Sequence, residues 1–238
     1  MSDWKTRTAL LYGEEKMKRL ANAHVLVVGL GGVGAYAAEM LVRAGVGKFT
    51  LVDSDTINTS NINRQLPALH STVGEVKIEV LAERFRLINP EVQIELIQEF
   101  IKDEGIDELF DREGANYDFV VDAIDTLSPK CFLIAKAFSR GHQLISSMGA
   151  GAKKDITKVC FGSVWKTTNC KLSRAVRKRL KRIGVTQDLP VVYSTEAANP
   201  EAIIQIDYEQ NKKSTSGTVS YMPAVFGCYL AEYVLERL

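Results

Sequence analysis

The first half of the chain alternates short apolar runs with longer stretches whose apolar positions recur every three or four residues. The runs are typical of strands buried on both faces of a parallel sheet, and the spaced positions are typical of amphipathic helices. This alternation predicts an α/β fold, a doubly wound and mostly parallel Rossmann-like sheet. The expected strands are 25–28, 48–52, 92–97, 118–122 and 144–147, and the expected helices lie within 1–24 and at 35–44, 74–88, 103–112 and 129–139.

The pattern changes after residue 151. Residues 158–165 alternate apolar and polar side chains, which predicts a half-solvated antiparallel strand. A basic helix, a mobile loop and an amphipathic closing helix are expected at 171–184, 197–216 and 222–238. We therefore divide the chain into a Rossmann-like core with an N-terminal arm at 1–151 and a smaller C-terminal portion at 152–238, packed on the same core.

A glycine-rich turn follows the first expected strand. Gly29, Gly31 and Gly34 satisfy G-x-G-x-x-G, and a helix begins directly after them. Glycines let the backbone turn sharply and approach a phosphate, while the helix N-terminus favours an anion. Asp53 ends the next strand, where a carboxylate can bind ribose hydroxyls. The context predicts a nucleotide site, and a tight turn without a ligand is the alternative.

Further polar residues follow the ends of the expected strands. Asn61, Arg64 and Lys77 come after the second strand, and Asp125 comes after the fourth. Strand ends of an open α/β sheet converge on one crevice, so we expect these groups around one nucleotide. Arg and Lys suit the phosphates, and an Asp can hold Mg²⁺ against them. This set predicts ATP and Mg²⁺, since hydride transfer with NAD has no use for a γ-phosphate site.

Five motifs, GLGGVG, LVDSD, NINRQ, VGEVK and DAIDT, resemble in order and spacing the ATP-dependent adenylating enzymes that activate ubiquitin-like proteins. The resemblance covers about residues 6–151 and implies an E1-like adenylating fold. It implies that Arg7, Arg64, Lys77 and Asp125 are catalytic and that Asp125 carries Mg²⁺. Arg7 matches an arginine that reaches into the partner subunit's ATP site, which implies a homodimer. The implied nucleotide-binding residues are Gly29, Gly31, Gly32, Gly34, Asp53, Asp55, Asn61, Arg64, Gln65, Lys77, Asp125 and Thr126.

Three departures narrow the resemblance. The two C-x-x-C pairs of many relatives are absent, no cysteine has a clear thioester context, and Thr126 stands where many relatives have Asn. The stretches RTALLYGEEKMKRL, DAIDTLSPKCFLI, RKRLKRIG and VVYSTE instead resemble the subfamily that cyclises N6-threonylcarbamoyladenosine at position 37 of tRNA. The resemblance thus implies carboxylate adenylation on a tRNA substrate. Activation of a ubiquitin-like sulfur carrier and NAD-dependent oxidoreduction are the alternatives.

The basic stretch 171–184 holds seven Lys or Arg residues and no acid. Since the net charge is only +1, binding to nucleic acid must come from such a local patch. A solvated helix face is the alternative interpretation. The apolar face expected for this helix consists of Leu172, Val176, Leu180 and Ile183. The residues expected to contact tRNA are Lys171, Arg174, Arg177, Lys178, Arg179, Lys181 and Arg182.

The remaining features bear on compartment and partners. The four cysteines have no C-x-x-C spacing, which favours reduced thiols over disulfides or a structural zinc. The N-terminus lacks a signal-peptide core, and no apolar run is long enough to span a membrane. We expect a cytoplasmic protein. A sulfur-transfer or cysteine desulfurase system is left open as a partner.

Overall fold

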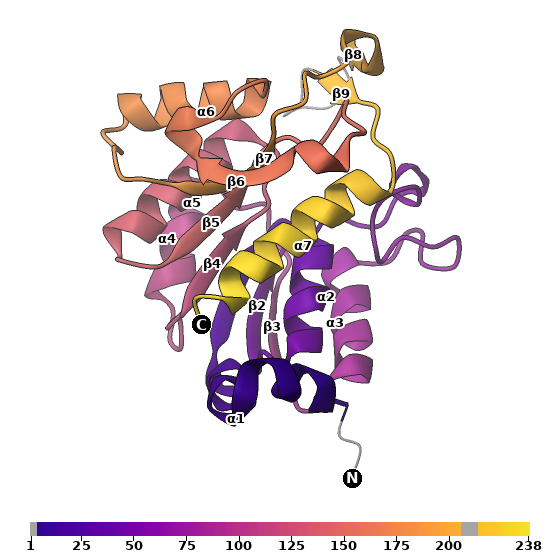
Figure 1. The fold of residues 1–238 in the computed structure, drawn as a ribbon, viewed down its shortest axis with the longest axis vertical. Helices are drawn as coiled ribbons and strands as arrows, with labels where there is room; N and C mark the ends of the chain where they lie inside the picture. Colours follow the sequence, from indigo (N-terminus) through magenta and orange to yellow (C-terminus); the bar gives the residue numbers. More distant parts are fainter. Residues whose placement is uncertain (1–3, 206–213) are drawn as a thin grey trace.

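The computed structural model describes residues 4–205 and 214–238, and a seven-stranded sheet lies at its centre (Figure 1). The sheet is ordered β3-β2-β1-β4-β5-β7-β6, and among these strands only β6 runs antiparallel to its neighbour. The prediction of a doubly wound, mostly parallel sheet is confirmed. The strands are β1 (His24–Val28), β2 (Lys48–Val52), β3 (Gln93–Ile97), β4 (Phe119–Asp122), β5 (Leu144–Ser147), β6 (Val159–Ser163) and β7 (Pro190–Ser194).

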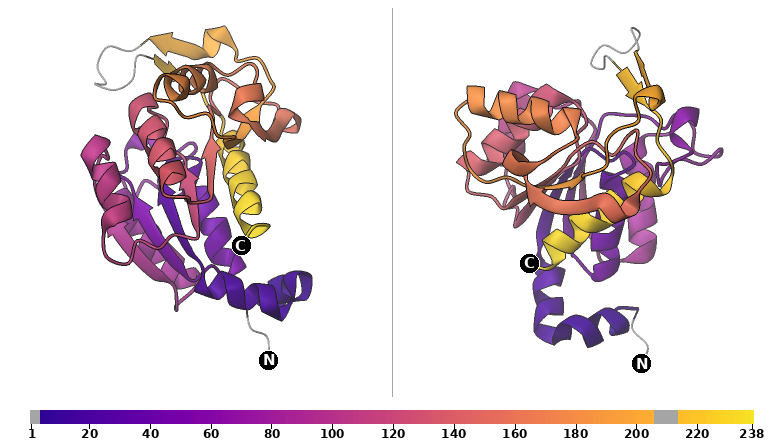
Figure 2. Two further views of the ribbon diagram at one scale, coloured as in Figure 1. Left: turned by 90° about the vertical axis from the view of Figure 1, so that its left-hand side faces the viewer. Right: turned by 45° about the horizontal axis from the view of Figure 1, so that its top comes forward.

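Helices cover both faces of the sheet (Figure 2). Along β1, Val25 and Val27 belong to one apolar cluster and Leu26 and Val28 to the other, because successive side chains of a strand point to opposite faces. The first cluster contains residues of α1, α2, α3 and α7, and the second those of α4, α5 and α6. The helices are α1 (Thr6–Asn22), α2 (Gly34–Ala44), α3 (Lys77–Ile88), α4 (Asp103–Asp111), α5 (Leu127–Ser139), α6 (Lys171–Arg182) and α7 (Tyr221–Leu235).

Several predicted boundaries differ from the structure by up to three residues. Helix α3 begins at Lys77 and not at residue 74, because Gly74 has φ +94° and Val76 pairs with Thr56 in an isolated antiparallel bridge. The expected strand 158–165 is shorter, since β6 gives way to a 3₁₀ turn at Val164–Lys166. The closing helix spans Tyr221–Leu235, so it begins one residue before the expected range 222–238 and ends three residues before the end of that range.

The sequence patterns did not predict β7, which joins β5 and β6 in the main sheet. The loop predicted for 197–216 was wrong for residues 200–205 and 214–216. They hold a 3₁₀ helix at Pro200–Ala202 and a two-stranded antiparallel sheet of β8 (Ile203–Gln205) and β9 (Ser214–Ser216). Residues 206–213 of that prediction lie outside the described residues. Within the described part of the chain, no helix is both long and apolar enough to cross a bilayer.

Helix α7 packs against α2 at close range, and Gly227 makes this possible. A Cβ atom at Gly227 would lie 2.6 Å from the Val33 carbonyl oxygen and 2.7 Å from Cβ of Tyr36. The start of the same helix reaches the glycine turn, because a Cβ on Gly32 would lie 3.1 Å from Cβ of Pro223. The last helix of the chain therefore rests on the turn after the first strand.

The histidine at the start of β1 is buried in a polar network. His24 is 4% exposed, and its Nε2 lies 2.9 Å from Oγ1 of Thr50, whose hydroxyl donates to Glu95. Burial, reinforced by the positive charge of Lys48, lowers the pKa of His24 to about 4. The folded protein therefore holds this imidazole neutral at pH values where the unfolded chain would protonate it.

We expect the free energy of unfolding to fall as the pH drops from about 6.5 towards 4, because the unfolded state then binds the extra proton. The stabilising contribution is fully present above pH 6.5. Urea denaturation at pH 7.5 and pH 5 measures this change. The variant His24→Gln should show a smaller difference between the two pH values, whereas His70→Gln, at an exposed position, should behave like wild type. An unchanged pH dependence in His24→Gln would contradict the assignment.

Candidate active site

In the glycine turn between β1 and α2, two glycines pack closely against backbone atoms and a third has open space beside it. Gly29 has φ +87°, and a Cβ there would lie 2.8 Å from the Ala123 carbonyl oxygen. A Cβ on Gly34 would lie 1.8 Å from the carbonyl oxygen of Gly29. At Gly31 the nearest atom to such a Cβ is Nε2 of Gln65, at 3.7 Å. Two glycines are thus required by packing, while Gly31 leaves room for a ligand to approach the backbone.

The end of β2 is tied to this turn. Oδ2 of Asp53 accepts a hydrogen bond from Leu30 N at 2.6 Å, and Oδ1 accepts one from Asp55 N at 2.9 Å. Lys77, 1% exposed at the start of α3, places Nζ 3.3 Å from Asp53 Oδ1 and 3.0 Å from Asp55 Oδ2. Three residues expected at the site therefore form one network beside the glycine turn.

The segment after β2 folds into a 3₁₀ turn that holds the next two site residues. Oδ1 of Asn61 accepts from Asn58 N at 3.0 Å, and the Asn58 side chain accepts from Ser60 N. The guanidinium of Arg64 donates to Ser60 O at 2.7 Å and to Oδ1 of Asn63 at 2.9 Å. These bonds engage only Nη1 of Arg64 and only the oxygen of the Asn61 amide. Their remaining N–H groups are suited to phosphate oxygens.

Gln65 and the loop after β4 complete the crevice. Oε1 of Gln65 is buried and has no hydrogen-bond partner among the described residues, so this acceptor can serve a ligand donor. Asp125 is exposed in the loop between β4 and α5, and Thr126 precedes the first residue of α5. Because β1 and β4 are neighbours where the strand order reverses, this loop faces the glycine turn across the crevice where ligands bind in open α/β sheets.

The donor set around the crevice suits a metal held mainly through phosphates. Within 4–205 and 214–238, no cluster of three or more His, Cys, Asp or Glu side chains is arranged to hold a metal ion. Mg²⁺ commonly takes one or two protein carboxylates and completes its coordination with substrate phosphates and water. The exposed carboxylate of Asp125 fits that pattern.

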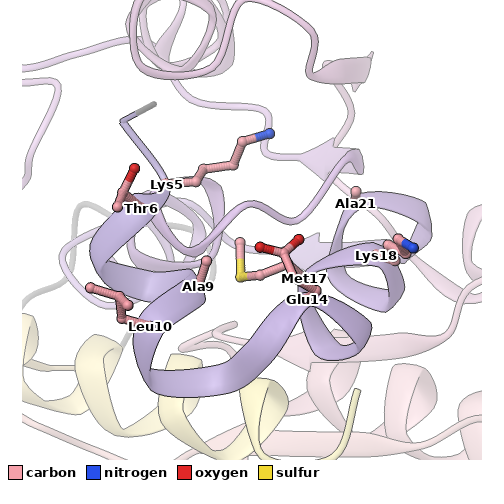
Figure 3. A pocket seen from close by; sticks show the side chains of 8 residues that line it. All are labelled: Lys5, Thr6, Ala9, Leu10, Glu14, Met17, Lys18 and Ala21. Carbon is pink, nitrogen blue, oxygen red and sulfur yellow. The ribbon is translucent and has the colours of Figure 1, made fainter. Parts of the chain in front are cut away.

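Arg7 lies at the opposite edge of the sheet from the crevice. It is exposed on α1, and α1 packs on the turn that precedes β2, where Gly47 N donates to Leu20 O at 3.0 Å. Gly13, with φ +78°, bends α1 into an elbow around a hollow of about 420 Å³, and Leu10 lies at its rim (Figure 3). Arg7 is therefore distant from the crevice at the carboxyl ends of the strands. The side chains that line the hollow are Lys5, Thr6, Ala9, Leu10, Glu14, Met17, Lys18 and Ala21.

Some cations of the basic helix α6 contact neighbouring parts of the fold, and the others are exposed to solvent. Arg177 is half-buried and donates to the carbonyl oxygens of Val164 and Thr167, while Arg179 stacks on the Phe132 ring. Val176 and Leu180 are buried as expected, but Ile183 is 37% exposed, so its predicted place on the buried face was wrong. Helix α6 ends at Arg182, one residue before it. The exposed cations are Lys171, Arg174, Lys178, Lys181 and Arg182.

Sequence reasoning missed a buried ion pair directly beneath the loop that carries Asp125. Asp122 and Lys130 are both 0% exposed, and Nζ of Lys130 lies 2.8 Å from Oδ2 of Asp122. The available signals were an acid closing the apolar strand β4 and a lysine followed by apolar residues in α5. Neither signal reveals burial by itself.

Comparison with known proteins gives matches over nearly the whole chain. A model described as the ThiF family matches residues 5–238. The tRNA threonylcarbamoyladenosine dehydratase of Escherichia coli (strain K12) is 39% identical over 255 residues, which cover 99% of this chain and 94% of that protein. The molybdopterin-synthase adenylyltransferase of Salmonella typhimurium is 34% identical over 143 residues, or 60% of this chain and 56% of that protein.

Solved structures agree with the sequence matches. Two structures described as E. coli tRNA N6-threonylcarbamoyladenosine dehydratase, in complex with AMP and with ATP, superpose on this chain with TM-scores of 0.87 and 0.86. Their sequence identities are 36% and 35%, and each alignment covers 98% of this chain and 92% of the solved chain.

Proposed function

The chain belongs to the ThiF family, and from that premise we propose that it is an ATP-dependent enzyme that cyclises N6-threonylcarbamoyladenosine in tRNA. The observation that carries the proposal is the extent of the match. The similarity to the E. coli dehydratase continues through α6 and α7, whereas the match to the sulfur-carrier adenylyltransferase covers 60% of the chain. The part of the chain that the shorter match leaves out is thus shared with the dehydratase.

The reaction runs in two steps. The threonyl carboxylate of the modified nucleoside attacks the α-phosphorus of ATP, which forms an acyl-adenylate and releases pyrophosphate. A nitrogen of the same side chain then attacks the activated carbonyl, loses its proton and expels AMP as the ring closes. Because the substrate supplies its own nucleophile, no enzyme thiol is needed, and proximity supplies much of the rate.

The crevice residues have distinct roles in this scheme. The backbone at Gly31 receives the nucleotide, and Asp53 takes the ribose hydroxyls. Arg64 and Lys77 bind phosphate oxygens and offset the charge that develops on them. Asp125 would hold Mg²⁺, which when bound would supply further charge neutralisation at the phosphates. Support for this assignment comes from the bonds that join the glycine turn, Asp53 and Lys77 into one network.

A homodimer with a composite site accounts for the position of Arg7. The arginine lies on α1, at the opposite edge of its own sheet from the crevice, so it acts on the nucleotide of a second subunit. Leu10 and Leu11 on the same helix are 83% and 79% exposed, and a partner subunit would cover them. A sulfur-transfer partner and a cytoplasmic location stay predictions.

The exposed cations of α6 form the proposed contact with the tRNA backbone. Arg174, Lys178 and Arg182 are spaced four residues apart, which places them along one line of the helix surface. Arg177 and Arg179 contribute less, since the first is bonded to carbonyl oxygens and the second is stacked on Phe132.

The triple variant Arg174→Gln, Lys178→Gln, Arg182→Gln is expected to weaken tRNA binding and flatten its salt dependence, because fewer counterions are released. The slope of log K against log salt should fall by about 0.7–0.9 for each phosphate that is no longer neutralised. Filter binding over a salt series measures it, with ATP affinity as an internal control. A matched triple of exposed cations on other surfaces, Arg86→Gln, Lys102→Gln and Arg112→Gln, should leave the slope unchanged. Equal slopes in wild type and the α6 variant would mean that α6 is only a solvated face.

The direct test of the function is mass spectrometry of tRNA nucleosides after incubation with the protein, ATP and Mg²⁺. We expect the threonylcarbamoyl nucleoside to lose one water in an ATP-dependent manner, with release of pyrophosphate. Thermal shifts in parallel should show much stronger protection by ATP–Mg²⁺ than by NAD. Pyrophosphate release that requires a Gly-Gly-ended carrier protein in place of tRNA would support the sulfur-carrier alternative, and stronger protection by NAD would support an oxidoreductase.

A further inference from the structure

A completely buried network links the end of β4, the start of α5 and β5. Nζ of Lys130 lies 2.8 Å from Oδ2 of Asp122 and donates to the carbonyl oxygen of Ile124 at 2.8 Å. The hydroxyl of Ser146 donates to the same Oδ2 at 2.6 Å, and Oδ1 accepts from Ile124 N at 3.1 Å. Lys130, Asp122 and Ser146 are each 0% exposed. The network therefore holds both backbone polar groups of Ile124.

Those bonds determine the course of the loop that carries Asp125. The carboxylate of Asp122 holds the N–H of Ile124, and the ammonium of Lys130 holds its carbonyl, so the peptide that leads into Asp125 is restrained from below. The preceding residue, Ala123, forms the floor of the glycine turn, since its carbonyl oxygen would lie 2.8 Å from a Cβ on Gly29. The loop thus has fixed contacts on both sides of Ile124, and Asp125 projects from it.

Stability alone does not account for this arrangement. Burying the charges of Lys130 and Asp122 carries a desolvation penalty that offsets much of the attraction between them. A protein with a well-packed apolar pair of similar volume in their place is often as stable or more stable. An apolar pair could not bind the Ile124 carbonyl oxygen, however. The property that distinguishes Lys130 from an apolar residue is therefore its hydrogen bond to the loop at Ile124, and not an effect on folding stability.

We propose that Lys130, paired with Asp122, is a positioning residue that acts through the Ile124 carbonyl to aim the Asp125 carboxylate at the metal and phosphates of bound ATP. This inference rests on the proposed function, because it takes Asp125 as the residue that meets the nucleotide's metal. Lys130 itself touches neither nucleotide nor substrate, since it is enclosed below the loop.

The test uses a double variant that keeps the core electrically balanced. Lys130→Met alone leaves the Asp122 carboxylate buried without its partner, which is expected to destabilise the fold strongly. Lys130→Met combined with Asp122→Leu removes both charges and leaves an apolar pair. We expect this double variant to fold, with a melting temperature below that of wild type but above that of Lys130→Met, because only the Ser146 hydroxyl and the Ile124 N–H lose their acceptor. We expect the rate of ATP–pyrophosphate exchange with tRNA to fall by about 100-fold, as a misplacement near 1 Å can cause.

The pattern of the loss separates positioning from a merely structural role. The Mg²⁺ concentration for half-maximal exchange should rise several-fold, while KM for ATP changes little, because the glycine turn and Lys77 are intact. The conservative variant Lys130→Arg should regain part of the rate, since a guanidinium can pair with Asp122 and donate to the Ile124 carbonyl. Glu39→Gln is the control: it disturbs a 3% exposed carboxylate that pairs with Arg43 and Arg84, and should lower stability without changing the Mg²⁺ requirement.

A double variant with the wild-type rate and the wild-type Mg²⁺ requirement would overturn the inference. So would a rate loss that Glu39→Gln reproduces at equal loss of stability. Failure of the proposed function is recognised separately, because the wild-type protein would then show no tRNA-dependent exchange and no preference for ATP–Mg²⁺ over NAD.

Discussion

Subunits carrying Arg7→Ala and subunits carrying Asp125→Ala are each expected to be inactive alone and to regain activity when mixed. A site built from one subunit's Asp125 and its partner's Arg7 is incomplete in either pure variant. In a mixed dimer, one of the two sites has both residues. Random assembly makes half of the dimers mixed, so recovery should reach roughly a quarter of wild-type activity.

Each single variant should lose at least about 100-fold in rate, in line with the removal of one charge-stabilising group from a preorganised site. Dimers assembled from differently tagged subunits and purified by both tags make the measurement unambiguous. Arg19→Ala, at another exposed arginine of α1, is the matched control and should remain active by itself. Purified mixed dimers without activity, or an active Arg7→Ala variant, would contradict an arginine supplied across the interface.

Gly34→Ala is expected to lower the stability of the fold, whereas Gly31→Ala is expected to lower ATP affinity alone, although both glycines belong to the same motif. At position 34 the new methyl group would lie 1.8 Å from the Gly29 carbonyl oxygen, and both groups belong to the backbone framework. The N-terminus of α2 would have to move, at a cost of about 3 kcal/mol or more. We expect a large fall in the unfolding free energy, measured by urea denaturation, and loss of ATP binding with it.

At position 31 the new methyl group meets only Nε2 of Gln65, at 3.7 Å, an ordinary contact distance. The unfolding free energy should stay within about 0.5 kcal/mol of wild type. The methyl would occupy space that the nucleotide needs, so ATP affinity measured by calorimetry should fall by about tenfold. Normal ATP binding in Gly31→Ala would place the nucleotide elsewhere, and a stable Gly34→Ala would show that the turn can relax.

The sequence predicts the parts of this fold whose signals are local. Residues 25–53 contain an apolar run, a glycine turn, a helix and a second apolar run. Each feature fixes where the next one can begin, so β2 is predicted with its observed bounds. Strand β7 has no comparable signal, because a short run that begins with Pro190 becomes a strand only by pairing with β5 and β6. The start of α3 depends likewise on the distant bridge between Thr56 and Val76.

In the candidate site, too, residues with a local sequence signal are predicted, and residues that depend on tertiary contacts are not. Gly29, Gly34 and Asp53 belong to a motif whose spacing carries the chemistry, and the structure shows the contacts that require them. The sequence does not indicate that Lys130 is buried, because a lysine in a helix is usually solvated. Its burial follows from the packing of α5 against β4 and β5. The same limit applies to Arg177, whose bonds to Val164 and Thr167 depend on tertiary structure.

The contact of α7 with the glycine turn has a consequence for synthesis on the ribosome. Pro223 and Gly227, which close on Gly32 and α2, are translated about 190 residues after the turn. At about 5–20 residues per second, the growing chain spends many seconds with the apolar flank of α2 uncovered. During that interval the nascent protein has its nucleotide-binding motif but not the support that seats it. During the gap between translating the motif and completing its pocket, the uncovered apolar surface of α2 makes the nascent chain prone to aggregation.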